Sequence, residues 1–124
     1  MNPVSMKNLV KRFTNQNGVM ICWNPMIEQE DSRGDKIMVP GEQVQTAKVL
    51  FIKERFNPLR EIAAVMGITA DPGRYLITLP EIRILKNTII TIIGDGSKWK
   101  AGTPDLFDIA GQKIAWQIAL TEME

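Results

Sequence analysis

Length, composition and charge are those of an ordinary globular domain. The chain has 124 residues, of which 44% are apolar and 23% charged, and its formal net charge is +1. A chain of this length is expected to form a single domain, residues 1–124, that folds without disulfide or metal cross-links. The near-neutral charge excludes a strong electrostatic attraction of the whole chain to nucleic acid. There is no histidine and one cysteine, Cys22, which excludes an internal disulfide and suits a reducing compartment. With no signal-peptide pattern and only short apolar runs, we expect a soluble, intracellularly made protein.

The first segment has the apolar spacing of a short helix. Its stripe sits at i, i+3, i+4 and i+7 and comprises Met6, Leu9, Val10 and Phe13. Ser5 is the expected cap, and Asn15-Gln16-Asn17-Gly18 is expected to end the helix before a strand at Val19–Trp23. The cations on the other side, Lys7, Lys11 and Arg12, predict a solvated face rather than a phosphate contact.

Residues 24–45 form the least regular part of the chain. Turn formers and charges dominate there, and a short strand is predicted at Ile37–Val39 before Pro40-Gly41. An irregular stretch of this length is normally mobile or functional. Two interpretations stay open: a mobile surface loop, or an arm that contacts a partner. The candidate partner-binding residues are Glu28, Glu30, Asp31, Arg33, Asp35, Lys36, Ile37, Met38 and Val39.

The middle of the chain predicts two strands around a short inserted helix. Gln45–Phe56 is a strand with apolar residues on both faces, and Arg74–Leu79 is a strand that Pro80 ends. Between them, Asn57-Pro58 is typical of a helix start and Gly67 of a helix end. Glu81–Asn87 is expected to be an irregular connection.

The C-terminal third predicts a strand, a tight turn and two further strands. Its parts are an apolar strand at Thr88–Ile93 covered on both faces, a turn at Gly94-Asp95-Gly96, a strand at Ser97–Ala101, a loop at Gly102–Asp108 and a last strand at Ile114–Leu120. In the last strand Ile114, Trp116, Ile118 and Leu120 share a face, so we expect Trp116 to be buried among them.

These elements predict a mainly β fold. Sequential strands with tight turns favour a small antiparallel SH3-like barrel with a peripheral N-terminal helix, a short inserted helix and a long loop. A two-layer α+β sheet is the alternative.

Candidate chemistry is sparse, so we expect no enzyme, no cofactor and no metal site. Cys22 in an apolar strand is typical of a small core residue. The loop carboxylates Asp95, Asp105 and Asp108 match no calcium spacing and favour turn or capping roles. Nucleic-acid binding by a small barrel stays an alternative, because Lys98 and Lys100 flank Trp99, although core packing of that ring is favoured.

The C-terminal half resembles the head–tail connector proteins of tailed bacteriophages, in particular the small stopper or head-completion proteins. The pattern reads Arg74-Tyr75-Leu76-Ile77-Thr78-Leu79, Thr88–Ile93, Gly94-Asp95-Gly96, Ser97-Lys98-Trp99-Lys100 and Lys113–Leu120. The family often has Gly-Asp before the apolar strand, where this chain has Lys86-Asn87. The resemblance therefore leaves open whether the chain is a stopper, an adaptor or a tail terminator protein.

The resemblance implies a structural protein of the virion, made in the cytoplasm of a host bacterium. Copies would form a homo-oligomeric ring between portal or adaptor proteins and tail proteins, with no membrane contact. Phage DNA would pass transiently through the channel, and near-neutral charge suits a ring past which DNA must slide. Residues 24–45 would then be the arm between rings or toward the lumen. The competing class is a small-barrel regulator that binds nucleic acid.

Overall fold

A computed structural model describes residues 2–52 and 74–123. The elements are α1 (Pro3–Asn17), β1 (Val19–Trp23), β2 (Met26–Glu30), β3 (Lys36–Pro40), β4 (Gln45–Ile52), β5 (Arg74–Thr78), β6 (Ile89–Ile92), β7 (Lys98–Ile109) and β8 (Gln112–Glu122). The inserted helix predicted at Asn57–Gly67 lies outside the described residues.

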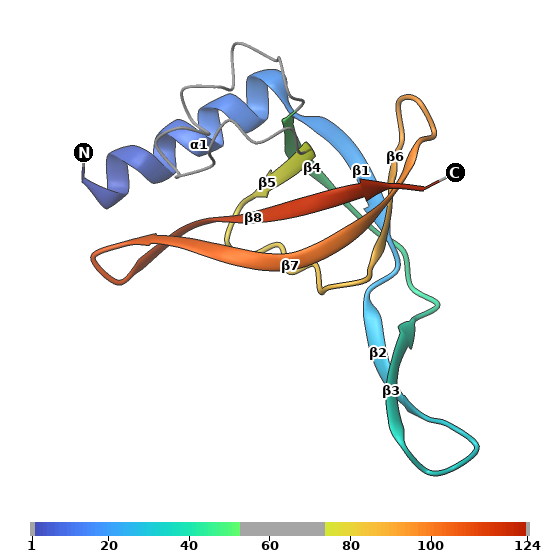
Figure 1. Cartoon of the computed structure of the whole chain (residues 1–124). Helices are drawn as coiled ribbons and strands as arrows, with labels where there is room; N and C mark the ends of the chain where they lie inside the picture. The colour runs from blue at the N-terminus through green and yellow to red at the C-terminus, as the bar shows by residue number, and fades with distance from the viewer. Residues whose placement is uncertain (1, 53–73, 124) are drawn as a thin grey trace.

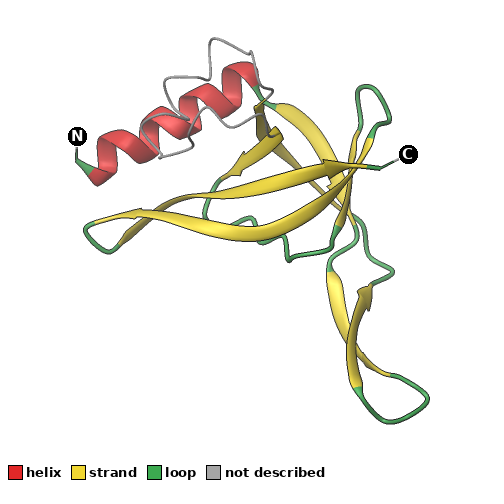
Figure 2. Cartoon of the chain, in the orientation of Figure 1, coloured by secondary structure: helices red, strands yellow, loops and turns green. Residues whose placement is uncertain are grey.

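Six strands close into an antiparallel barrel in the order β1-β4-β5-β8-β7-β6, and β2 and β3 form a separate two-stranded sheet. Figure 1 shows α1 beside the barrel at one end of the molecule and the β2–β3 pair projecting from the other. The mainly β barrel with a peripheral N-terminal helix is confirmed (Figure 2). In the described residues no helix is long and apolar enough to cross a membrane.

Helix α1 covers part of the outer surface of the barrel. Its cap is Asn2 rather than the predicted Ser5, and the Asn2 Oδ1 accepts a hydrogen bond from the Ser5 backbone N–H at 2.8 Å. Pro3 follows at the start of the helix, where its missing N–H costs nothing. Met6 and Val10 are fully buried, which confirms the predicted stripe, and the helix packs on β4 and β8.

The barrel strands therefore serve two cores. The barrel core takes side chains from all six barrel strands and comprises Ile21, Trp23, Val49, Phe51, Leu76, Ile84, Ile90, Ile92, Trp99, Ala101 and Ile118. The helix core lies beneath α1 and comprises Met6, Val10, Leu50, Ile52, Ile77, Ile114 and Ala115. Residues of a strand alternate between its faces, so β4 sends Val49 into one core and Leu50 into the other. This division explains why β4 is apolar on both faces.

Strand β8 also contributes residues to both cores, and the prediction that Trp116 is buried with Ile114, Ile118 and Leu120 is wrong. Trp116 is only half-buried and packs at the edge of the barrel core, where its Nε1 donates to the Pro80 carbonyl oxygen at 3.1 Å. Ile118 and Leu120 pack in or against the same core, whereas Ile114 packs beneath α1. The alternation of β8 does not gather its four large apolar residues into one cluster, because the strand runs from one core to the other.

Two further strand predictions need correction. Strand β7 continues through the predicted loop Gly102–Asp108, with irregular register between Ala101 and Pro104, and again between Phe107 and Asp108. Such irregularities accommodate a proline within a strand. The predicted strand Thr88–Ile93 is not fully covered on both faces: Ile90 and Ile92 are buried, whereas Ile89 is half-buried and Ile93, just beyond β6, is 51% exposed. The outer face of this part of the barrel wall is therefore only partly covered.

The turn between β6 and β7 is as predicted. Gly96 has φ of +73°, and its N–H donates to the Ile92 carbonyl at 2.8 Å. The Asp95 Oδ1 accepts hydrogen bonds from the backbone N–H and the hydroxyl of Ser97, at 2.9 and 2.6 Å. The turn role of Asp95 is therefore confirmed. The core role expected of Cys22 is wrong: its neighbours Ile21 and Trp23 point inward, and Cys22 is half-buried on the outer face.

Candidate partner-binding ribbon

Residues 26–40, called the ribbon here, form an antiparallel hairpin rather than an irregular stretch. Strands β2 and β3 pair from Met26 opposite Pro40 to Glu30 opposite Lys36. The predicted strand at Ile37–Val39 is confirmed within β3. The expectation of an irregular segment was wrong because β2 alternates uncharged and charged residues only from Ile27 to Glu30, a weak signal next to so many turn formers.

The turn at the tip is held by Asp31. Its Oδ1 accepts hydrogen bonds from the backbone N–H groups of Arg33 at 2.8 Å and Asp35 at 3.0 Å. Gly34 has φ of +82°, a conformation that glycine adopts without strain. Asp31 therefore shapes the turn in addition to carrying a charge at the tip.

The base of the ribbon is tied where the chain leaves and re-enters the barrel. The Asn24 Nδ2 donates to the Gly41 carbonyl at 2.9 Å, and the Gly41 N–H donates to the Pro25 carbonyl at 2.9 Å. A Cβ at Gly41 would lie 3.0 Å from the Pro25 oxygen. These contacts hold the two strands together as they project from the barrel.

The register gives the ribbon two chemically different faces, because directly opposed residues share a face. The charged face carries Glu28, Glu30, Lys36 and Met38, and the apolar face carries Ile27, Gln29, Ile37 and Val39. On the charged face Lys36 Nζ lies 3.6 Å from Glu28 Oε1, and both side chains are exposed. Ile27, Ile37 and Met38 are 50%, 40% and 49% exposed. A two-stranded hairpin that exposes this much apolar surface is a feature typical of contact sites.

The structure brings all nine sequence-predicted residues into this one ribbon: Glu28, Glu30, Asp31, Arg33, Asp35, Lys36, Ile37, Met38 and Val39. Sequence reasoning left out Ile27 and Gln29, which complete the apolar face. The alternation within β2 could have identified them. The ribbon holds four carboxylates against two cations, a net charge of −2.

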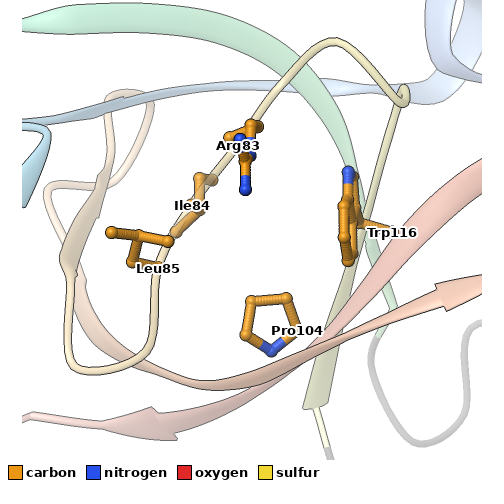
Figure 3. A pocket seen from close by; sticks show the side chains of 5 residues that line it. All are labelled: Arg83, Ile84, Leu85, Pro104 and Trp116. Atoms are coloured by element: carbon orange, nitrogen blue, oxygen red, sulfur yellow. The ribbon is translucent and has the colours of Figure 1, made fainter.

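Among the described residues, three open hollows adjoin one another, because neighbouring hollows share Pro25 or share Arg83 and Leu85. The largest, about 480 Å³, borders the apolar face and is lined in part by Ile27, Val39 and Gly41. The second, about 280 Å³, includes Trp23 and Thr88, whose Nε1 and Oγ1 are buried without a hydrogen-bond partner. Figure 3 shows the third, about 210 Å³, lined by Arg83, Ile84, Leu85, Pro104 and Trp116. Its lining is mostly apolar and holds no carboxylate, thiol or hydroxyl for catalysis.

Other candidate chemistry is not assembled in the described residues. Residues 2–52 and 74–123 contain no group of three His, Cys, Asp or Glu side chains that could hold a metal ion. The loop position expected of Asp105 and Asp108 is wrong, because both are exposed on strand β7, whereas Asp95 belongs to the β6–β7 turn.

The aromatic residue weighed for base stacking belongs to the barrel core. Trp99 is 4% exposed, its ring centroid lies 5.3 Å from that of Phe51, and the Arg74 guanidinium lies 5.0 Å from its centroid. Its Nε1 donates to the Ser97 hydroxyl at 2.9 Å. Core packing of Trp99 is confirmed. Across residues 2–52 and 74–123 every aromatic ring is buried or half-buried, so this part of the chain presents no open stacking platform.

No protein-family model and no curated protein sequence matches the chain.

Proposed function

We propose that the chain is a structural subunit of a tailed bacteriophage or prophage that joins head to tail as a ring between portal and tail. The type is a stopper or head-completion protein, with a tail terminator as the nearest variant. The sequence pattern of the C-terminal half suggests this role, and the fold is compatible with it. The observation that carries it furthest is the ribbon, a projecting hairpin with exposed charged and apolar faces.

The ribbon suits contact with another protein better than a role in its own fold. Both described cores are built without any ribbon residue. The barrel is closed, so its six strands leave no free sheet edge, and the outer edges of β2 and β3 stay available for pairing. A hairpin that contributes nothing to either core and keeps its edges and faces open supports an assembly role.

The charge of the ribbon favours a protein partner over DNA. With a net charge of −2 across residues 26–40, it would be repelled by phosphate. The burial of Trp99 also removes the observation that favoured a nucleic-acid-binding regulator. We therefore assign the ribbon to protein neighbours within the particle rather than to the DNA channel.

Inactivation of the gene in the phage or prophage that carries it tests this proposal. Electron micrographs of the lysate should show tails of full length that are not attached to heads, and a plasmid copy of the chain should restore joined particles. Joined, infectious particles in the absence of the chain would contradict the proposal.

A further inference from the structure

We infer that the charged face of the ribbon docks on the outer face of α1 in a second copy of the chain. This inference rests on the proposed ring of identical copies and names the contact that would build it. The proposed contact joins Glu28, Glu30 and Met38 of one copy to Val4, Lys7 and Lys11 of the next.

The outer face of α1 has the opposite charge. The helix carries Lys7, Lys11 and Arg12 and no carboxylate. Lys7 and Lys11 are one turn apart and therefore neighbours on the helix surface. Val4 lies one turn before Lys7 on the same side and is 60% exposed. The helix thus presents an exposed apolar residue next to two cations.

The spacing between the two glutamates of the ribbon matches the spacing between the two lysines of α1. Glu28 and Glu30 are two residues apart on a strand, a separation of about 6.6 Å along its axis. Lys7 and Lys11 are four residues apart on a helix, a separation of about 6 Å along its axis. Met38 lies directly opposite Glu28 and is 49% exposed, so it can pack against Val4 when the charges pair.

Position and charge both favour contact between unlike ends of successive copies. Figure 1 places α1 and the ribbon at opposite ends of the molecule. Contact between unlike ends repeats from copy to copy and closes into a ring when the rotation permits. Pairing of two ribbons would instead bring together two segments of net charge −2, which disfavours a symmetric dimer through this element.

Sedimentation of the purified full chain at low salt, up to millimolar concentration, tests the contact. We expect wild-type self-association that weakens as salt is raised, because exposed charges are screened. K7E/K11E and E28K/E30K should each reduce the association constant by about tenfold or more, because attractive pairs become repulsive. Combining the two double variants in one chain should restore association, because the charges are then exchanged.

Matched controls separate this contact from general charge effects. K98E/K100E and D105K/D108K change net charge by the same amounts at exposed positions of β7 and should leave association unchanged. Lys36→Glu removes the one cation of the charged face and should strengthen association. Thermal unfolding should show that all variants remain folded.

The outcomes are distinct from those of the gene-inactivation experiment. A wild-type chain that stays monomeric throughout, charge variants that associate like wild type, or a combined variant that is not restored would each overturn the contact. If heads and tails nevertheless fail to join without the chain, the proposed function stands and only the contact is wrong. If the contact is found but joining is normal, the chain self-associates for another purpose.

Discussion

At the scale of single residues, Trp99 and Trp116 show how one residue type takes different roles on neighbouring strands. Trp99 is buried between Phe51 and Arg74 and its ring nitrogen is hydrogen bonded to Ser97. Trp116 lies at the edge of the same core and borders an open hollow. Because Trp99 is more deeply buried than Trp116, its replacement is expected to destabilise the protein more.

Replacing Trp99 with alanine should reduce the free energy of unfolding by about 3–5 kcal/mol, because the ring leaves a cavity in a closed barrel. Trp116→Ala should cost about 1–2 kcal/mol, because part of that ring is already in water. Urea unfolding of the two variants beside wild type checks both values. An equal or reversed order would contradict the burial described here.

Sequence patterns predicted the burial of residues less well in strands that contribute to both cores. Alternation correctly placed Val49 and Leu50 on opposite faces of β4, yet it could not show that both faces are covered. The same limit caused the error at Trp116. A strand that runs from one core to another keeps its alternation but changes its neighbours, and this depends on where α1 docks.

At the scale of elements, β1 and β5 agree closely with the structure because each is an apolar run with a clear stop, such as Asn24-Pro25 or Pro80. The N-terminal helix is confirmed by its period, but it begins at Pro3 and includes Asn15–Asn17, which were expected to end it. Strand β7 was underestimated because Gly102 and Pro104 are usual loop residues, whereas here they occupy an irregular stretch of strand. The ribbon was missed as a hairpin for a related reason. Its pairing depends on the Asp31 turn and the tie at Gly41, neither of which gives a periodic signal.

The ribbon should exchange its amide hydrogens faster than the barrel in the isolated subunit. Within the described residues its strands pair only with each other, and a lone two-stranded hairpin is marginally stable in water. Hydrogen exchange followed by mass spectrometry should therefore separate residues 26–40 from β1, β4 and β8. Protection of the ribbon equal to that of β4 would show that it belongs to the folding core.

Shortening the ribbon should leave the barrel intact. Replacing Gln29–Ile37 with Asn-Gly joins the opposed pair Glu28 and Met38 through a two-residue turn. Because neither core contains a ribbon residue, the midpoint of thermal unfolding should shift by only a few degrees. Loss of cooperative unfolding in this variant would contradict an independent ribbon.

At the scale of the whole molecule, an almost neutral net charge is distributed unevenly. The ribbon carries a net charge of −2 and α1 carries three cations, at opposite ends of the molecule. Such a molecule has little overall attraction to a polyanion but can be oriented by its own copies. This distribution is expected of the proposed ring subunit rather than of a regulator that binds nucleic acid.

The isolated chain should accordingly bind duplex DNA poorly. At physiological salt we expect any dissociation constant to be weaker than about 10⁻⁴ M, the weak end of non-specific binding. A mobility-shift titration with duplex and single-stranded DNA checks this. A tight complex with a steep salt dependence would favour the regulator instead.

Complementation of a phage or prophage that lacks the gene tests the central claim most directly. Wild-type chain and the chain with the shortened ribbon would be supplied from a plasmid, and joined particles counted by electron microscopy. We predict that wild type restores joined particles, whereas the shortened chain, folded and equally abundant, leaves heads and tails separate. Equal numbers of joined particles with the two chains would contradict the assignment of the ribbon as the assembly arm.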